Sequence, residues 1–468
     1  MSAVRITARE SAVDQRRAAA GLLDQGVRAG DRVTIVGASS SEYLAVVLGA
    51  LRVGIVPVLL NPACTSRELT ALLADADPVV TLRDADLVRL VATGHEVDLA
   101  DAPLARPMLY TSGTTGTPKG VWSGVLEERA AAAALAEERE LWAFAADDLH
   151  LVVSPLYHSA PLRFAAGTLL AGGDVIVSGS FDLESLATTI ATARPTSAFV
   201  VPTHLRRLLT SSDPPPLGSF RLVAHAGAPC PARLKRAAID AFPTGSVWEF
   251  YGSTEGQFTA CPAEEWQVRP GTVGRARPGR RLGIEASPAA DAPEDQPPED
   301  QPPEDQPPED QTGVIWCDVP EFARFEYWGD PVRTAAAWRG DAFTVGDLGR
   351  LDVDGYLFLD GRRDDLLITG GINVYPLEVE HALLEHPAVR DAAVFGVADD
   401  EWGQRVCAAV VAEVAPDELA AWLRDRLAPH KRPKELFPVH EIPVSPTGKV
   451  RRSTLAADLG LDRLPGSR

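Results

Sequence analysis

The chain has 468 residues, of which 24% are charged and 45% hydrophobic, and this is typical of a globular protein with several domains. Its formal net charge of −20 disfavours nucleic acid as a partner, because binding phosphates needs concentrated Lys and Arg. No apolar run reaches the roughly 20 residues of a membrane helix, and the first residues lack the apolar core of a signal peptide. The five cysteines are scattered without CxxC spacing, so a disulfide framework or a zinc ribbon is not expected. We expect a cytoplasmic protein that works away from membranes.

The first half of the chain alternates helical and strand patterns. Residues 10–26 predict a helix and residues 33–37 a strand. Ser39, with Glu42 three residues later, resembles a capping box that opens the next helix. A second strand is expected at 56–61. Strand, helix and strand at this spacing form a βαβ unit, which requires a parallel sheet.

The same pattern recurs at 149–178 and at 183–225, which predicts an α/β fold built from several βαβ units. Beyond these units the pentapeptide PPEDQ repeats in tandem within 291–311. Proline removes backbone donors and the acids repel one another, so this stretch predicts a disordered surface insertion. Shorter strand patterns follow, with Asp354 and Gly355 as a hairpin signal, and a compact α+β module completes the pattern.

A glycine- and hydroxyl-rich stretch, 111-TSGTTGTPKG-120, follows an apolar strand pattern. Glycines allow close approach of a ligand to the backbone, and turn N–H groups, hydroxyls and Lys119 supply donors for phosphate oxygens. We expect a strand before this turn and a helix after it. The GxxxxGK[ST] spacing of the Walker motif is absent. The stretch predicts a phosphate-binding loop of another kind, with a simple exposed turn as the alternative.

Four further strings follow in the chain: 251-YGSTE-255, 346-GDLGRLD-352, 361-GRRDD-365 and 446-PTGKV-450. Together with the loop they resemble the ordered motifs of the adenylate-forming superfamily, which includes acyl-CoA synthetases, firefly luciferase and peptide-synthetase adenylation domains. The resemblance covers roughly residues 30–455. It implies a large AMP-binding N-terminal domain, 1–363, of doubly wound βαβ subdomains plus a small barrel-like β portion. A small, mobile α+β C-terminal domain, 364–468, would follow.

Members of that superfamily let a carboxylate attack the α-phosphorus of ATP, which gives an acyl-adenylate and pyrophosphate, and a thiol then displaces AMP. Such phosphoryl transfer depends mainly on positioning and charge neutralisation. The resemblance therefore implies a ligase that uses ATP, Mg²⁺ and coenzyme A. Strings such as PLYHSAP and GGINVYPLEVE look most like bacterial acyl-CoA synthetases. They imply an acid–CoA ligase. The PPEDQ insertion departs from the family pattern, and it makes secondary metabolism or antibiotic biosynthesis the expected setting.

The resemblance also implies which residues bind the phosphates of ATP. In the glycine-rich loop the implied contacts are Thr111, Ser112, Gly113, Thr114, Thr115, Gly116 and Lys119. In the second motif, Tyr251 and Gly252 would lie along the nucleotide and Thr254 near the α-phosphate. Glu255 would hold Mg²⁺. A lone acid after a turn is usually only solvated, and the YGST that precedes Glu255 is what favours the metal role.

Other motif residues are implied to bind the nucleoside and the acid. Gly227 and Ala228, in 225-HAGAP-229, would lie along the adenine, where small residues permit close approach. Asp347 would accept hydrogen bonds from both ribose hydroxyls, since an ionised carboxylate offers two acceptor oxygens. Arg362 would contact ribose or phosphate. His158, in PLYHSAP, would gate the acyl pocket, although an isolated histidine after a strand is more often a packed or surface group.

The C-terminal motifs imply a mobile domain that serves two half-reactions. Lys449, in PTGKV, resembles the lysine that bridges the carboxylate and the α-phosphate. Asp364 matches the hinge about which the domain rotates after adenylation. Gly370 and Gly371 match the loop that then admits the pantetheine arm of the thiol substrate.

Two alternatives remain open from the sequence. Some relatives of acyl-CoA synthetases activate nitrite to diazotise an aryl amine, and their adenylate site would have the same residues. The other alternative is a non-catalytic scaffold that docks a partner through the PPEDQ repeat. The expected partners are otherwise small molecules, and the expected oligomeric state is a monomer or a homodimer.

Lys449→Ala is expected to abolish acid-dependent ATP–pyrophosphate exchange and to leave ATP binding largely intact. The lysine cation would offset the charge that develops as two anions approach each other in a water-poor site. Exchange at the wild-type rate in this variant would contradict the assignment.

Asp364→Pro is expected to impair thioester formation more than adenylation, because proline fixes φ at a residue whose rotation is needed only between the two half-reactions. The two half-reactions are measured separately, as pyrophosphate release and as thioester yield from preformed adenylate. Equal losses in both would remove the hinge role.

Overall fold

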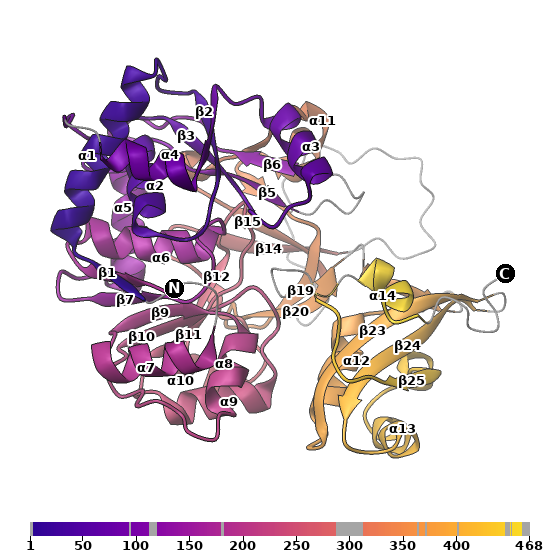
Figure 1. The fold of residues 1–468 in the computed structure, drawn as a ribbon. Helices are drawn as coiled ribbons and strands as arrows, with labels where there is room; N and C mark the ends of the chain where they lie inside the picture. Colours follow the sequence, from indigo (N-terminus) through magenta and orange to yellow (C-terminus); the bar gives the residue numbers. More distant parts are fainter. Residues whose placement is uncertain are drawn as a thin grey trace.

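The computed structural model shows an α/β protein with a large N-terminal domain and a small α+β C-terminal domain (Figure 1). It describes residues 3–92, 95–111, 119–178, 182–286, 312–362, 365–369, 372–399, 402–444, 450 and 452–460. The PPEDQ insertion predicted at 291–311 lies outside the described residues. The expected fold class is confirmed.

The first βαβ units form a six-stranded sheet with the strand order β16-β6-β5-β3-β2-β4. Its strands are β2 (Arg32–Val36), β3 (Val56–Leu60), β4 (Val80–Arg83), β5 (Met108–Thr111), β6 (Lys119–Trp122) and β16 (Glu326–Tyr327). The neighbouring helices are α1 (Ala8–Asp24), α2 (Ser41–Arg52), α3 (Ser66–Ala76) and α4 (Asp84–Val91). Strands β2 to β5 run parallel, as the βαβ pattern predicted. Strand β6 pairs antiparallel with β5, and β16 pairs antiparallel with β6.

Two local predictions in this region were wrong. The hydroxyl of Ser40, not Ser39, caps α2 by accepting the backbone N–H of Tyr43 at 3.1 Å, while the Ser39 hydroxyl accepts the N–H of Leu156 at 3.0 Å. The glycine-rich stretch is followed by strand β6 and not by a helix, because its end pairs back onto β5 in an antiparallel hairpin. Helix α5 (Glu128–Trp142) starts only after that strand.

The second group of βαβ units forms an eight-stranded sheet, ordered β1-β8-β7-β9-β10-β11-β12-β13. Its strands are β1 (Val4–Ile6), β7 (Leu149–Val152), β8 (Asp174–Val177), β9 (Ser197–Val200), β10 (Leu222–His225), β11 (Val247–Glu249), β12 (Thr259–Pro262) and β13 (Arg275–Ala276). Its helices are α6 (Ser159–Leu170), α7 (Leu183–Ala193), α8 (Pro202–Leu209), α9 (Ala232–Ala241) and α10 (Ala263–Val268). The central strands β8, β7, β9, β10 and β11 are parallel, so the predicted units at 149–178 and 183–225 are confirmed.

A third, antiparallel sheet corresponds to the small β portion of the large domain. It contains β14 (Arg281–Ala286), β15 (Gly313–Asp318), β17 (Trp338–Arg339), β18 (Ala342–Phe343), β19 (Asp347–Leu351) and β20 (Leu357–Arg362), with α11 (Pro331–Ala337) nearby. The hairpin predicted at Asp354 and Gly355 joins β19 to β20, and Gly355 has a φ of +80° that suits glycine.

The C-terminal domain packs helices against one mainly antiparallel sheet. Its strands are β21 (Leu367–Thr369), β22 (Ile372–Val374), β23 (Val389–Asp399), β24 (Gly403–Ala412) and β25 (Glu435–Pro438). Its helices are α12 (Pro376–Leu384), α13 (Pro416–Arg424) and α14 (Arg452–Asp458). None of the helices in the described part of the chain is long and apolar enough to cross a bilayer.

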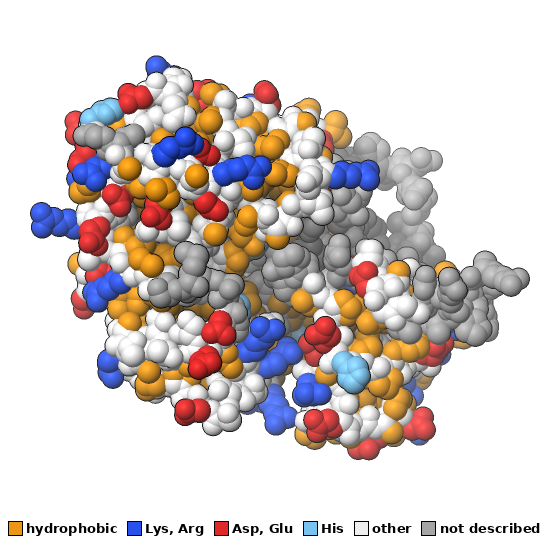
Figure 2. All heavy atoms as spheres, viewed as in Figure 1, with side chains coloured by type: hydrophobic (Ala, Val, Ile, Leu, Met, Phe, Trp, Pro, Cys, Tyr) orange, Lys and Arg blue, Asp and Glu red, His pale blue; other side chains and the backbone are white. Residues whose placement is uncertain are grey.

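Among the described residues, the contacts between the C-terminal domain and the large domain include an apolar one and a polar one. Tyr375, which precedes α12, packs against an apolar cluster of the third sheet that contains Trp316 and Leu348. Figure 2 shows basic side chains gathered where the two domains meet. At this junction, Arg206 of α8 forms a 3.1 Å ion pair with Asp391, and Arg233 of α9 donates to the carbonyl of Pro387 at 2.8 Å.

Candidate active site

The hairpin of β5 and β6 brings the two ends of the glycine-rich loop together. Thr111 and Lys119 are register partners in this hairpin. The loop residues between them, Ser112, Gly113, Thr114, Thr115 and Gly116, lie outside the described residues. The Lys119 ammonium stands 4.8 Å from the centre of the Tyr327 ring, within the range of a cation–π contact. The lysine is therefore held against β16, the neighbour of β6.

Tyr327 also holds the predicted metal ligand. Its hydroxyl donates to Oε1 of Glu255 at 2.9 Å, and the Tyr327 and Glu255 side chains are both buried. Burial and the adjacent carboxylate raise the pKa of Tyr327, so its hydroxyl stays protonated and can donate. The sequence analysis missed Tyr327, which lies in the string 325-FEYWGDP-331.

Glu255 was predicted to hold Mg²⁺, and its surroundings suit one oxygen ligand. Only one of its carboxylate oxygens accepts a hydrogen bond from a described residue, and carboxylate oxygen is a preferred ligand for this ion. Among the described residues no three His, Cys, Asp or Glu side chains cluster as metal ligands. Mg²⁺ is usually bound through one or two carboxylates together with substrate phosphates and water, and Glu255 would supply one such carboxylate.

A second tyrosine–carboxylate pair joins the eight-stranded sheet region to the third sheet. The Tyr251 hydroxyl donates to Oδ2 of Asp347 at 2.5 Å, and only 7% of Asp347 is exposed. Asp347 opens β19 and is the register partner of Arg362 at the end of β20. The structure therefore places two residues from separate motifs opposite each other. The side chain of Arg362 is outside the description.

The motif 251-YGSTE-255 forms a tight turn. Gly252 bridges to Gln257, and the N–H of Ser253 donates to the carbonyl of Gly256 at 2.8 Å. A Cβ at Gly252 would stand 2.8 Å from both Gln257 Cα and the Gly256 carbonyl oxygen, so a larger residue would open the turn. Thr254 lies within this turn, between the residues that carry the two tyrosine–carboxylate pairs.

The predicted adenine segment follows the carboxyl end of β10. Gly227 has a φ of +91°, which glycine adopts readily, and Ala228 comes next. Ligands in open α/β sheets usually bind beyond the carboxyl ends of the parallel strands. Strands β10 and β11 are parallel neighbours. The 226–229 segment follows β10 and the turn with Tyr251 follows β11, so both lie at this edge of the sheet.

His158 occupies the N-cap position of α6, and its ring lies 4.5 Å from the ring of Tyr157. Further along the same helix, an aromatic cluster that the sequence analysis missed fills the space against the sheet. Its buried members are Trp142, Phe144, Phe164, Phe199 and Phe250. The Arg163 guanidinium stands 5.0 Å from the Phe250 ring, and its Nε lies 3.6 Å from a carboxylate oxygen of Glu138.

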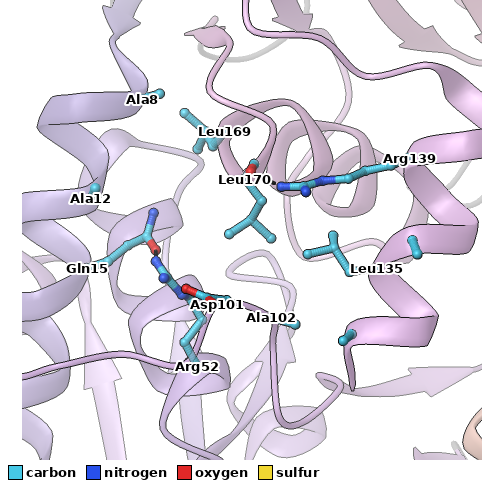
Figure 3. Close-up of a pocket in the computed structure, with 12 residues that line it drawn as sticks. Ala8, Ala12, Gln15, Arg52, Asp101, Ala102, Leu135, Arg139, Leu169 and Leu170 are labelled. Atoms are coloured by element: carbon cyan, nitrogen blue, oxygen red, sulfur yellow. Dashed lines mark hydrogen bonds between the residues drawn. The ribbon is translucent and has the colours of Figure 1, made fainter. Parts of the chain in front are cut away.

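A separate cleft of about 530 Å³ lies between α1, α5 and α6 (Figure 3). In it Arg52 donates to the side-chain oxygen of Gln15 at 2.9 Å, and Arg139 donates to the carbonyl of Leu170. The described lining includes none of the predicted site residues. It consists of Ala8, Ala12, Gln15, Arg52, Asp101, Ala102, Ala132, Leu135, Ala136, Arg139, Leu169 and Leu170.

Four predicted residues of the C-terminal half, Asp364, Gly370, Gly371 and Lys449, lie outside the described residues. Their neighbours are described. The ends of the strands that flank Gly370 and Gly371, Thr369 and Ile372, pair with each other, and Val444 forms an isolated bridge with Val450, the residue after Lys449. The roles assigned to these four residues stay predictions.

Comparisons with known proteins identify the family of the chain. Residues 1–316 match the AMP-binding enzyme family, and residues 378–449 match the AMP-binding enzyme C-terminal domain. The chain is 33% identical to a feruloyl-CoA synthase from Amycolatopsis sp, over 95% of this chain and 92% of that protein.

Solved structures with the same fold include ATP-bound MatB from Rhodopseudomonas palustris, with a TM-score of 0.81, 30% identity and coverage of 97% of this chain and 93% of that one. Another is o-succinylbenzoate CoA synthetase from Bacillus subtilis in complex with its acyl-adenylate intermediate, with a TM-score of 0.80, 26% identity and coverage of 96% and 92%. The chain belongs to the AMP-binding enzyme family, within the adenylate-forming superfamily.

Tyr251→Phe is expected to raise the KM for ATP, because it leaves the buried Asp347 carboxylate without its 2.5 Å donor. Loss of a hydrogen bond to a charged group costs about 1.5–3 kcal/mol, which corresponds to roughly tenfold or more in binding. Tyr327→Phe, which removes the equivalent donor of Glu255, is the matched variant. A KM for ATP unchanged by Tyr251→Phe would show that the pair does not shape the nucleotide site.

Proposed function

We propose that this enzyme activates a carboxylic acid with ATP as an acyl-adenylate and then transfers the acyl group to coenzyme A. The observation that carries the proposal is the pair of buried carboxylates, Asp347 and Glu255, each held by a tyrosine hydroxyl. Both tyrosine–carboxylate pairs involve the single segment 251–255, and Tyr327 of the Tyr327–Glu255 pair also contacts Lys119 at the end of the glycine-rich loop. Membership of the family gives the chain its class, an AMP-forming acid–thiol ligase.

The nucleoside half of ATP is proposed to bind between the strand exits and the third sheet. Asp347 keeps one oxygen on Tyr251 and would accept from the ribose hydroxyls, and a carboxylate has acceptor capacity for both tasks. Gly227 and Ala228 would lie along the adenine, because they present backbone and a single methyl group. Arg362, opposite Asp347, would contact the ribose or a phosphate.

The triphosphate is proposed to lie between the glycine-rich loop and the 251–255 turn. Lys119 and Thr111 close the loop and would donate to phosphate oxygens, with Thr254 near the α-phosphate. Mg²⁺ bound at Glu255 would neutralise phosphate charge. Tyr327 contacts both Lys119 and Glu255, so it would keep the cation and the anion of this region at fixed positions.

The C-terminal domain is proposed to begin at residue 364 and to carry Lys449 to the α-phosphate for adenylation. The described polar contacts at its junction with the large domain include an ion pair between Arg206 and Asp391 and a hydrogen bond from Arg233. Ion pairs of this partly exposed kind contribute little, about 0–1 kcal/mol. Such a junction can reopen, as a domain that serves two half-reactions requires.

The acid is proposed to bind beyond His158, beside the aromatic cluster of α5, α6 and the eight-stranded sheet. Burial lowers the pKa of Arg163, which remains a cation next to Glu138 and the Phe250 ring.

The proposed location is the cytoplasm, and the proposed setting is secondary metabolism, on the basis of the PPEDQ insertion. None of the described contacts favours nitrite over a carboxylate as the activated oxyanion.

A pyrophosphate-release screen tests the proposal. Aliphatic, aryl and amino-aryl acids are supplied with ATP and Mg²⁺, and coenzyme A and nitrite are added as separate second substrates. We expect acid-dependent pyrophosphate release and a thioester product with coenzyme A. Asp347→Asn serves as the control that should depress release with every acid. Nitrite-dependent loss of an aryl amine without thioester formation, or no release with any acid, would overturn the proposal.

A further inference from the structure

A buried polar cluster lies under the loop that joins β10 to α9. Lys235 of α9 and His225 at the end of β10 have no exposed surface, and Glu249 at the end of β11 is 7% exposed. The Lys235 ammonium lies 2.5 Å from His225 Nε2 and 3.3 Å from a carboxylate oxygen of Glu249. His225 and Glu249 are register partners, the last pair of the β10–β11 ladder. One ammonium group therefore ties two parallel strands together where both leave the sheet.

The charge state of this cluster follows from burial. Burial and the neighbouring Lys235 hold the pKa of His225 well below its usual value, so the ring is neutral and Nε2 accepts from the ammonium. Burial raises the pKa of Glu249, and Lys235 opposes that shift by favouring the ionised carboxylate. Burial also raises the pKa of the Cys230 thiol, in the loop above, to about 12, with Glu249 and Lys235 among the contributing charges.

Stability alone does not account for a lysine at this position. Apart from Lys235, the buried face of α9 contains Ala238, which belongs to the apolar core beneath the sheet. Replacing a buried ion pair by apolar side chains of similar volume is often neutral or stabilising, because the charges must be desolvated. What the cluster provides instead is fixed geometry, since the Lys235 ammonium bonds to both His225 and Glu249 and so limits how the two strand ends can be spaced.

The two strand ends that Lys235 ties together lead directly into the nucleotide site proposed above. His225 precedes the predicted adenine segment, in which Gly227 has its φ of +91°. Glu249 precedes Tyr251 by two residues, and the Tyr251 hydroxyl bonds to Asp347. We propose that Lys235 is a positioning residue for ATP, setting the spacing between the adenine segment and the Tyr251–Asp347 pair. This inference rests on the proposed use of ATP, but it concerns a residue that would not touch the nucleotide.

Lys235→Met tests the proposal, because methionine retains most of the side-chain length without the ammonium. The dissociation constant of ATP is measured by calorimetry in the absence of any acid, so the result does not depend on knowing the acid. We expect the dissociation constant of ATP to rise about tenfold. Displaced strand ends would lose contacts with ATP that are equivalent to one hydrogen bond to a charged group. With an active acid in hand, the KM for ATP should rise in parallel while the KM for the acid stays unchanged.

The control for a merely structural effect is Leu205→Ala in α8. Leu205 is fully buried in the same apolar core as Ala238, and its truncation should lower the melting temperature through a cavity. It should leave ATP affinity at the wild-type value. Equal weakening of ATP binding by Leu205→Ala at a matched loss of melting temperature would overturn the proposal. So would wild-type ATP affinity in Lys235→Met.

Glu249→Gln provides a second variant should Lys235→Met fail to fold, since it keeps the ammonium and its bond to His225. It is expected to weaken ATP binding less than Lys235→Met, and wild-type affinity here would also contradict the proposal. A wild-type protein that does not bind ATP would overturn the proposed function and this inference together. A wild-type protein that binds ATP, beside variants that bind it equally well, would overturn only the role of Lys235.

Discussion

The site depends on the hydrogen bond between the Tyr251 hydroxyl and the Asp347 carboxylate. Tyr251 follows β11 of the eight-stranded sheet, whereas Asp347 opens β19 of the third sheet, and the two residues are 96 positions apart. A buried carboxylate is costly to desolvate unless a donor satisfies it. The hydrogen bond therefore favours the arrangement of the two sheets that brings Tyr251 and Asp347 together. A similar hydrogen bond, from Tyr327 to Glu255, attaches β16 to the same 251–255 segment. The three sheets of the large domain therefore converge on one short turn.

Apolar packing brings these elements into reach, and the polar contacts then fix their relative positions. Val121 of β6, Tyr251, Phe258, Tyr327 and Phe343 belong to one hydrophobic cluster that spans all three sheets. Apolar packing is non-directional and tolerates small shifts, whereas a buried hydrogen bond requires defined distances and angles. The buried cluster of Lys235, His225 and Glu249, beneath the site, likewise fixes the positions of its strands through polar contacts. In each case a buried polar group limits how the strand ends can move.

The junction between the domains has a different character. It combines a small apolar contact around Tyr375 with an ion pair and a hydrogen bond from two arginines of the large domain. No similar convergence of buried carboxylates and tyrosines joins the domains among the described residues. The large domain thus holds the residues proposed to bind the nucleotide through buried hydrogen bonds, while the described polar contacts of the C-terminal domain with it are individually weak. This division fits an enzyme in which the same large-domain surface serves two successive reactions.

The sequence by itself determined the fold class, the parallel βαβ units and the family, because hydrophobic periodicity and short glycine-rich motifs are local properties. It also predicted Asp347, Arg362, Tyr251 and Glu255 as site residues, and these roles stay predictions. It misplaced the cap of α2 and the element after the glycine-rich loop, since both depend on partners distant in sequence: the Leu156 N–H that takes Ser39, and the pairing of β6 with β5. Tyr327 and Lys235 became visible only in the tertiary structure. A tyrosine on an edge strand and a lysine on a helix have no local signature, and their significance comes from the buried carboxylates that the fold places beside them.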